Sequence, residues 1–340
     1  MGAPDLATKE FMQDNAVFAD TFNFYLFEGE QMIRPEQLRA VDTTELAIPF
    51  NEKNEDREIQ KTRDLLKCLT VKQDDHATYL LLGIENQTMV HYAMPVRNML
   101  YDAIQYARQV ETLASRHRTD RDRSGHTSAE YLSGIYREDR LIPVITLVVL
   151  FSPDPWDGPK SLSELFSVSE PRISRFIQDY RLNLIEPAKL TDEELRQFQG
   201  DMREVMGFIK YSNDMNKVAE LVENDKRFEA LSRNAARVIN KCTNSELSFN
   251  EESEAIDMCK AIRDMRELSE AIGMEKGMEK GMEKGMEKGM EKGLEQGMEK
   301  GKLEQSKASA KKMYATGLSL AQIAYFLGSD ESHVSAWLAE

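Results

Sequence analysis

The chain has 340 residues and a mass of 38.9 kDa, which is enough for about two domains of ordinary size. The 59 acidic residues outnumber the 44 Lys and Arg residues, so the formal net charge is −15. This balance excludes a globally basic protein that coats nucleic acids. A protein of this charge would contact DNA through a local basic patch, or through metal ions that offset its own carboxylates.

Cysteine spacing and apolar runs restrict the compartment that we expect. The three cysteines show no Cys-x-x-Cys spacing, so neither a disulfide framework nor a zinc site is indicated. The longest nearly apolar run, residues 141–151, is far shorter than the ~20 residues of a membrane-spanning helix. The first residues lack a basic segment followed by an apolar one, which argues against a secretory signal. We therefore expect a cytoplasmic protein without membrane contact.

The first part of the chain predicts both helix and strand. Aromatic residues at helical spacing predict one helix over residues 8–27, and residues 45–50 form a short strand candidate. Two apolar runs, residues 65–71 and 78–84, are separated by a polar Gln-Asp-Asp-His turn, which predicts a β-hairpin. Because the second run is apolar on both faces, we expect it to be a central strand.

A helix, a loop and a further strand are predicted next. Pro95 is well placed to begin a helix that runs through Leu113. Residues 114–127 contain no large apolar side chain, so we expect a mobile surface loop there. Residues 141–151 predict another buried strand, which a dense Pro and Gly turn signal closes.

The second half of the chain is predicted to be mostly helical. Thr191-Asp-Glu-Glu194 is a capping-box pattern, and an apolar stripe at helical spacing follows it. The stripe consists of Leu195, Phe198, Met202, Val205, Met206 and Ile209. We expect a helical extension without chemistry of its own.

From Gly273 to Gly301 the sequence repeats Gly-Met-Glu-Lys with a period of four residues. Four residues overshoot one helical turn by about 40°, so no residue type keeps a fixed face. Each glycine costs roughly 1 kcal/mol relative to alanine in a helix, and neighbouring Lys–Glu pairs return only a few tenths. We expect a flexible or marginally helical connector whose order depends on a partner strand. The alternative is a coiled coil that makes the chain a homo-oligomer.

The segment after the repeat predicts three short helices. Gly317 ends the first, Ser319 caps the second, and Ser329 or Asp330 caps the third. Their spacing is typical of a helix-turn-helix unit, because a small residue, a turn glycine and a buried aliphatic residue fall at the required positions. These residues are Ala324, Gly328 and Val334.

Two functions are open for this C-terminal segment. The last helix lacks Lys and Arg, whereas Lys311 and Lys312 on the preceding helix are candidate contacts to DNA. The alternative is a small module that binds protein.

One pair of acidic residues carries the predicted chemistry. If the hairpin turn is centred between Asp74 and Asp75, Asp64 lies directly opposite Glu85, and Gln87 lies two positions further on the same face. Carboxylate oxygens are the ligands that Mg²⁺ prefers, and bound Mg²⁺ activates water for attack on a phosphodiester. The pattern predicts a metal site, which a one-residue register slip would remove. The alternative is that both acids are ordinary charges at strand ends.

Five segments carry a resemblance to a known family. They are Gln13-Asp14-Asn-Ala-Val-Phe18, Arg63-Asp64-Leu-Leu, Tyr79-Leu-Leu-Leu-Gly-Ile-Glu85-Asn86-Gln87, Met94-Pro-Val-Arg97-Asn-Met-Leu-Tyr101 and residues 141–151. In this order they resemble the recombination-promoting nuclease (Rpn) family, whose members are commonly labelled transposases and belong to the PD-(D/E)XK nuclease superfamily. The match covers roughly residues 8–160.

The resemblance implies a restriction-endonuclease-like mixed sheet flanked by helices, with Mg²⁺-dependent cleavage of DNA and a role in recombination or transposition. Asp64 and Glu85 would ligate the metal, and Asp14 would support them from the first helix. Gln87 would replace the superfamily's lysine in orienting the water, but a neutral amide does not stabilise the transition state as a cation would. Arg97 would either bind a phosphate near the site or pair with a carboxylate of the helix that it begins.

These observations predict an α/β (α+β) chain of four parts. They are a nuclease-like domain over residues 1–190, a helical extension over 191–272, a repeat linker over 273–301 and a helix-turn-helix-like module over 302–340. The predicted function is that of a Mg²⁺-dependent DNA endonuclease. The alternative is a catalytically weak or inactive relative that binds DNA or a protein partner through its helical parts.

Overall fold

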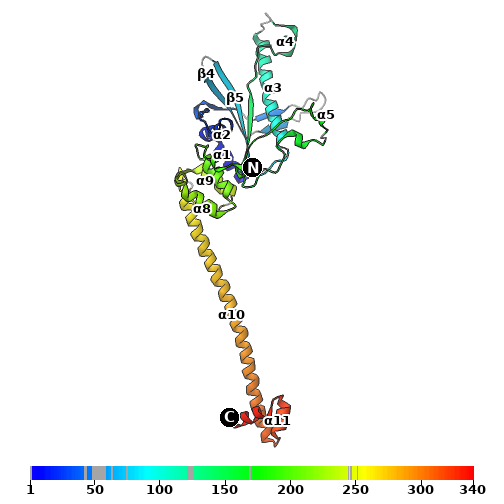
Figure 1. Cartoon of the computed structure of the whole chain (residues 1–340), viewed down its shortest axis with the longest axis vertical. Helices are drawn as coiled ribbons and strands as arrows, with labels where there is room; N and C mark the ends of the chain where they lie inside the picture. The colour runs from blue at the N-terminus through cyan, green and yellow to red at the C-terminus, as the bar shows by residue number, and fades with distance from the viewer. Residues whose placement is uncertain are drawn as a thin grey trace. The chain divides into compact units, whose positions relative to one another are not determined.

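The computed structural model describes most of the chain. The described residues are 2–41, 44–47, 59–62, 64–73, 76–120, 126–167, 170–243, 245, 247–250 and 252–340. They separate into two compact units, Met1–Met265 and Arg266–Glu340 (Figure 1). Among the described residues, no helix combines the length and the apolar character that crossing a membrane requires.

A five-stranded mixed sheet with the order β1-β4-β5-β6-β7 lies at the centre of the first unit. Its strands are β1 (Leu38–Ala40), β4 (Leu65–Gln73), β5 (His76–Gln87), β6 (Val144–Leu150) and β7 (Asn183–Ile185). Strands β1, β4 and β5 pair antiparallel, whereas β6 pairs parallel with both β5 and β7. Strand β5 therefore lies in the middle of the sheet, which confirms the prediction of a central strand.

The first unit also contains two small antiparallel sheets and many short helices. The strands are β2 (Thr44–Ala47) with β3 (Ile59–Thr62), and β8 (Leu231–Ser232) with β9 (Ala255–Ile256). The α-helices are α1 (Ala3–Gln13), α2 (Asn15–Phe27), α3 (Met94–Asp120), α4 (Ser128–Ser133), α5 (Pro171–Ser174), α6 (Asp192–Leu195), α7 (Met202–Tyr211), α8 (Met215–Asn224) and α9 (Arg233–Thr243). Short 3₁₀ helices cover Pro35–Gln37, Leu162–Leu165, Pro187–Lys189 and Lys226–Ala230. The predicted mixture of strands and flanking helices is confirmed.

Helices cover both faces of the sheet, and β6 shows how the residues divide between them. Leu147 and Val149 belong to the core shared with α1, α2, α7 and α9. Val148 and Leu150 alternate with them and pack against Met94 of α3 on the other side. A strand buried on both faces reads as a continuous apolar run, as residues 144–150 do.

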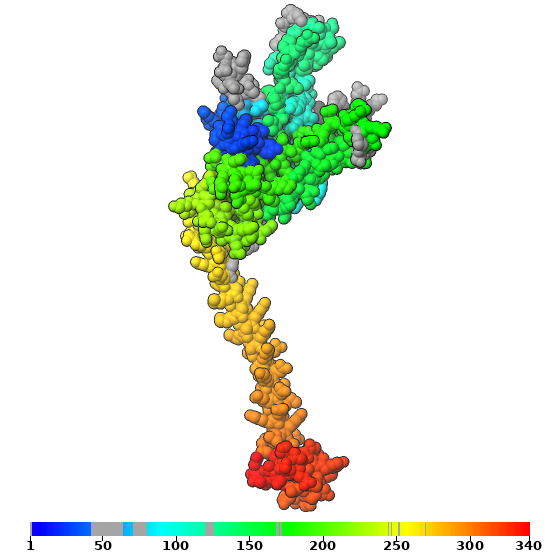
Figure 2. Space-filling view, in the orientation of Figure 1, coloured from blue at the N-terminus to red at the C-terminus, as the bar shows by residue number. Residues whose placement is uncertain are grey.

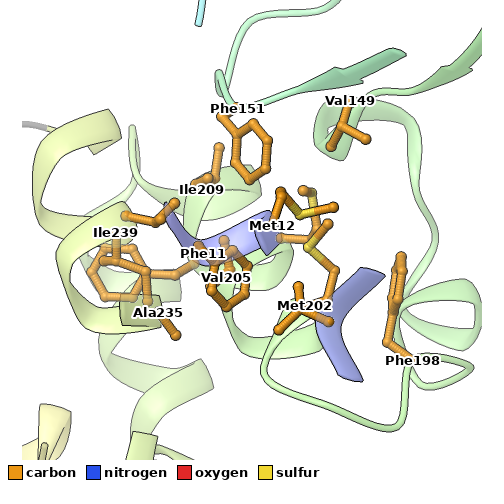
Figure 3. Close-up of a cluster of buried hydrophobic side chains, with 14 of the residues drawn as sticks. Phe11, Met12, Val149, Phe151, Phe198, Met202, Val205, Ile209, Ala235 and Ile239 are labelled. Carbon is orange, nitrogen blue, oxygen red and sulfur yellow. The ribbon is translucent and has the colours of Figure 1, made fainter. Parts of the chain in front are cut away.

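The larger core joins the first helix to the helical region that follows the sheet. In Figure 3, Phe11 and Met12 of α1 lie among side chains of α7 and α9, with Phe151 at the end of β6 nearby. Phe11 and Met12 are 1% and 0% exposed. The predicted boundary at residue 190 therefore does not separate two compact units, because this core spans it.

The hairpin has the register that the sequence predicted. Pairs run from Leu65 opposite Ile84 to Gln73 opposite His76. Asp74 and Asp75, the centre of the predicted turn, lie outside the described residues. This register places residue 64 opposite residue 85, where the candidate site lies.

The single helix predicted over residues 8–27 is wrong, because the chain forms α1 and α2 with a break at Asp14. The backbone of Asp14 has φ −59° and ψ 129°, outside the helical region. Its carboxylate accepts a hydrogen bond from the Ala16 N–H (2.7 Å) and so caps α2. The aromatic spacing hid this break because both helices bury aromatic side chains against the same core.

The mobile loop predicted from residue 114 is wrong as far as Asp120, because α3 continues to that residue. Ala114 is buried against Gly134, and the His117 ring stacks on Tyr136 with centroids 3.8 Å apart. His117 Nε2 also lies 2.9 Å from Asp139 Oδ2. Contacts with residues distant in sequence thus extend the helix, and local composition could not reveal them. Residues 121–125 lie outside the described part.

Two predicted strands are found with shorter bounds, and the helix that begins at the predicted capping box is also shorter than expected. Strand β2 covers 44–47 of the region predicted over 45–50, whose last three residues lie outside the described part. Strand β6 begins at Val144, after Pro143. Thr191 caps α6 as predicted, but α6 ends at Leu195 and the apolar stripe continues in α7 after a break.

The Gly-Met-Glu-Lys repeat lies within one continuous helix, α10 (Met258–Ala315), so of the flexible and the marginally helical connector that were expected, the structure shows a helical one. Figure 2 shows the side chains of this segment (yellow to orange) projecting outward. The methionines from Met274 to Met298 are 57–77% exposed. A Cβ built on any glycine from Gly273 to Gly301 meets no atom within 4 Å. No described residue of this chain packs on the repeat.

The C-terminal residues form the predicted small core. Helices α11 (Leu320–Leu327) and α12 (Glu331–Ala339) pack against the end of α10 through Ile323, Ala324 and Val334. Ser319 caps α11 with a capping box, and Asp330, rather than Ser329, caps α12. Gly328 has φ +66° between the two helices, a conformation that favours glycine. The first predicted helix, residues 310–315, is the last part of α10.

Candidate functional site

Asp64 and Glu85 come together where β4 begins and β5 nears its end. Asp64 Oδ2 accepts a hydrogen bond from the Asn86 N–H (2.9 Å), and the Asp64 N–H points to Glu85 Oε1 (3.4 Å). The Glu85 side chain is fully buried, whereas Asp64 is partly exposed. The hairpin register is the cause, because it aligns the two residues across neighbouring strands. The predicted juxtaposition of these two acids is therefore present.

Arg97 of α3 supplies positive charge to both acids. Its Nη2 lies 3.1 Å from Glu85 Oε2, and its Nε donates to the Tyr101 hydroxyl (2.9 Å). Tyr101 stands one helical turn after Arg97 and is 2% exposed. Arg97 does pair with a carboxylate, but the partner is Glu85 of β5 and not, as the sequence reasoning had it, a carboxylate of its own helix.

The pKa of Asp64 reflects this surrounding. Burial raises the pKa of the Asp64 carboxyl above its usual value, while the Asn86 N–H, Arg97 and Lys9 act to lower it. Asp5 of α1 adds a further negative charge nearby and accepts a hydrogen bond from the Thr88 hydroxyl (3.0 Å). Sequence reasoning missed Asp5 and Lys9 because only the packing of α1 brings them close.

Asp14, the acid expected from the first helix, lies elsewhere. The Asp14 carboxylate acts electrostatically on Lys67. Lys67 Nζ donates hydrogen bonds to the Gln13 carbonyl (2.8 Å) and to Asn15 Oδ1 (2.7 Å). Lys67 follows Asp64 by three residues, so its side chain leaves the opposite face of the strand. The structure therefore does not bring Asp14 to Asp64 and Glu85, and its carboxylate caps α2 instead.

Gln87 stands two residues after Glu85, so it is placed on the same face of β5, as predicted. Its Nε2 donates to the Asn86 carbonyl (2.9 Å), which holds the amide at the end of the strand. The side chain is partly exposed. The amide carries no charge.

Two buried amides adjoin the site residues in sequence. Asn86 follows Glu85 and is 7% exposed, and Asn98 follows Arg97 and is fully buried. Neither side-chain amide has a hydrogen-bond partner among the described residues. Buried polar groups without partners are rare in folded proteins and commonly mark a place for an ion, a water molecule or a catalytic function.

The donor set suits a hard divalent cation. Asp64 and Glu85 offer carboxylate oxygens from adjacent strands, and Mg²⁺ typically takes one or two carboxylates with water and phosphate oxygens. The residues present therefore fit the predicted Mg²⁺ in charge and in ligand type.

A second group of metal-ligating atoms lies in the segment after α3. His126, Glu130 and Glu138 each place one ligand atom within 4.8 Å of the others. Both Glu130 oxygens accept hydrogen bonds, from Thr127 and from the Arg137 N–H, and these bonds lower the pKa of Glu130 to about 2. Sequence reasoning missed this group because it treated His126 as part of a loop.

A third titratable group, Glu204 of α7, is buried away from the sheet. It is 1% exposed and lies 2.9 Å from Arg227 Nε, with Arg203 at 3.8 Å. Burial raises the pKa of Glu204 to about 7, although the two arginines act to lower it. A cavity of about 120 Å³ adjoins it, lined also by Leu195, Gly207, Leu221 and Phe228.

We expect Glu204 to make the protein less stable as the pH rises from about 4.5 to about 7. Over this range the unfolded chain loses a proton that the folded chain keeps, so unfolding becomes more favourable with pH. Between these two pH values, the free energy of unfolding of the parent, measured with urea, should fall by on the order of 3 kcal/mol more than that of Glu204→Gln. Parallel pH profiles for the two proteins would contradict this assignment.

Comparison of the chain with models of known families, with curated proteins and with solved structures gave no match.

Proposed function

We propose that the first unit is a Mg²⁺-dependent endonuclease that hydrolyses phosphodiester bonds in DNA, with Asp64 and Glu85 as the metal ligands. The observation that supports this most is the meeting of the two carboxylates across β4 and β5, each within hydrogen-bonding reach of the other strand's backbone. A bound divalent ion would polarise the phosphodiester and lower the pKa of the attacking water. The resemblance to the Rpn family agrees with this chemistry, and a role in recombination or transposition would follow from DNA cleavage.

The other residues divide the remaining tasks. Gln87 orients the attacking water through a neutral amide at the end of β5. Arg97 presents a planar guanidinium, which suits bidentate contact with a phosphate. Because Gln87 does not supply the positive charge of a lysine, we expect slower cleavage than an enzyme with that cation would show.

The test is nicking of supercoiled plasmid by the full-length protein. We expect conversion to open circles in Mg²⁺, no conversion in excess chelator, and recovery when Mg²⁺ is restored. Cleavage of a double-stranded RNA of equal length under the same conditions tests the preference for DNA. If the purified, folded protein nicks no plasmid with Mg²⁺ or Mn²⁺, the proposed activity is wrong and the non-catalytic alternative remains.

That alternative, binding of DNA without efficient cleavage, is favoured by the C-terminal residues. The caps, the turn at Gly328 and the buried Val334 match the pattern of a helix-turn-helix unit. Lys311 and Lys312 are exposed at the end of α10. We propose that these two lysines contact DNA phosphates, which would give this unit a binding function whether or not the sheet domain cleaves.

Replacing Lys311 and Lys312 by Glu is expected to weaken binding of duplex DNA for all sequences alike. Each lost phosphate contact should reduce the slope of log affinity against log salt by about 0.9. Fluorescence anisotropy at several salt concentrations measures both effects. Lys280→Glu with Lys284→Glu makes the same charge change within the repeat. If this control pair weakens binding equally, the effect is one of net charge and the proposed contact is wrong.

A further inference from the structure

The candidate metal site contains its own cation. Glu85 is fully buried and pairs with Arg97 at 3.1 Å, and Arg97 also acts electrostatically on Asp64. A buried carboxylate needs a partner of opposite charge, because its desolvation is otherwise costly. Arg97 meets this need with one positive charge shared between two acids. Without a metal, the site is therefore compensated rather than left with two bare negative charges.

The arginine is held from its own helix as well as by Glu85. Its Nε donates to the Tyr101 hydroxyl at 2.9 Å, and the guanidinium carbon lies 5.5 Å from the centre of the Tyr101 ring. Tyr101 is buried and one turn further along α3. The guanidinium side chain is nevertheless 28% exposed, so one side of it reaches solvent. The two contacts use different nitrogens of the guanidinium, Nη2 for Glu85 and Nε for Tyr101.

A divalent ion on Glu85 would share its buried carboxylate with the guanidinium of Arg97, whose Nη2 lies 3.1 Å from Oε2. Mg²⁺ needs ligand oxygens at about 2.0–2.1 Å, and a metal on Glu85 would place two positive charges beside the Arg97 cation. The repulsion between them is strong where one partner is buried. This repulsion favours departure of the guanidinium from Glu85 Oε2 when a metal binds the carboxylate. A phosphate is the class of ligand that would stabilise the Arg97 guanidinium after it leaves Glu85.

We propose that Arg97 is an internal counter-ion that a divalent metal displaces from Glu85, and that the displaced guanidinium, still held by Tyr101, then binds a phosphate of the DNA. This inference rests on the proposed function, because it needs a metal on Asp64 and Glu85. Metal and DNA then favour each other's binding through one side chain, since each stabilises the state in which Arg97 has left Glu85.

The main test is Mn²⁺ binding to the full-length protein without DNA, measured by titration calorimetry and by the loss of the free-ion paramagnetic signal. We expect Arg97→Gln to bind Mn²⁺ at least about 10-fold more tightly than the parent, because no cation has to be displaced. Arg118→Gln removes an exposed arginine from the same helix and should leave the affinity unchanged. Asp64→Asn should lose binding in either background.

Two outcomes separate failure of the inference from failure of the proposed function. If the parent and Arg97→Gln bind Mn²⁺ equally and Asp64→Asn does not, the metal site stands and the counter-ion inference is overturned. If neither the parent nor Arg97→Gln binds Mn²⁺, the proposed metal site itself is wrong.

A second variant covers the case in which Arg97→Gln does not fold. Tyr101→Phe removes only the hydroxyl that holds Arg97 and keeps the arginine. We expect Tyr101→Phe to keep the Mn²⁺ affinity within about twofold of the parent, because Glu85 still holds the guanidinium. In Tyr101→Phe, the increase in DNA affinity on adding Mn²⁺ should be smaller than in the parent. Stopped-flow anisotropy of a labelled duplex measures this increase before cleavage. An unchanged gain in DNA affinity would overturn the role of the displaced guanidinium.

Discussion

Replacing Asp64 by Asn is expected to lower Mg²⁺-dependent plasmid nicking by at least about 100-fold without unfolding the protein. In the parent, the Asp64 carboxylate accepts a hydrogen bond from the Asn86 N–H at 2.9 Å. Asn has the same size, and its amide oxygen can still accept this bond. It lacks the negative charge that a hard cation needs, and loss of one preorganised electrostatic group commonly costs a factor of 10²–10³ in rate. The effect should therefore appear in the rate and not in the fold.

The measurement is the initial rate of conversion from supercoiled to open-circular plasmid, with circular dichroism as the check on folding. Glu111→Gln is the matched control, because it neutralises an exposed carboxylate on α3. We expect this control to nick at the parent rate. If Asp64→Asn and the parent nick equally fast, any cleavage arises elsewhere in the chain and the site assignment fails.

Truncating Phe11 to Ala should have the largest effect on stability. Phe11 is 1% exposed and packs with α7 and α9, so its loss leaves a cavity in the core that joins these helices to the sheet. Such truncations of buried aromatic residues cost about 3–5 kcal/mol. Urea unfolding followed by intrinsic fluorescence and by circular dichroism measures this loss in the first unit.

Leu6→Ala on the same helix provides the control. Leu6 is 49% exposed, so we expect its free energy of unfolding to change by less than about 0.5 kcal/mol. A small effect for Phe11→Ala, equal to that of Leu6→Ala, would show that α1 does not belong to the main core. In that case the approach of Asp5 and Lys9 to Asp64 would also lose its support.

Local patterns predicted those features of the fold that depend on neighbouring residues. The hairpin register followed from two apolar runs around a polar turn, and it aligned Asp64 with Glu85. The caps at Thr191, Ser319 and Asp330 followed from single polar side chains at helix starts. Each of these features is decided within about twenty residues of chain.

Features that depend on distant partners were predicted less well. The break at Asp14 was missed because α1 and α2 both pack aromatic residues on one core, which gave a continuous helical pattern. The end of α3 was misplaced because Tyr136 and Asp139, some twenty residues later, hold His117. Helix propensity alone predicted a flexible or marginally helical repeat, and the structure has a continuous helix there.

The sequence by itself determined strands β4, β5 and β6, the pairing of two acids across a hairpin and the starts of α3, α6, α11 and α12, because alternation, turns and caps act over short stretches of chain. Only the tertiary structure decided what surrounds those acids. Packing of α3 on the sheet sets Arg97 against Glu85. Packing of α1 brings Asp5 and Lys9 near Asp64, whereas Asp14 acts electrostatically on Lys67, on the other face. Charged side chains from separate elements meet only when the core forms, so local sequence patterns do not predict which of them are neighbours.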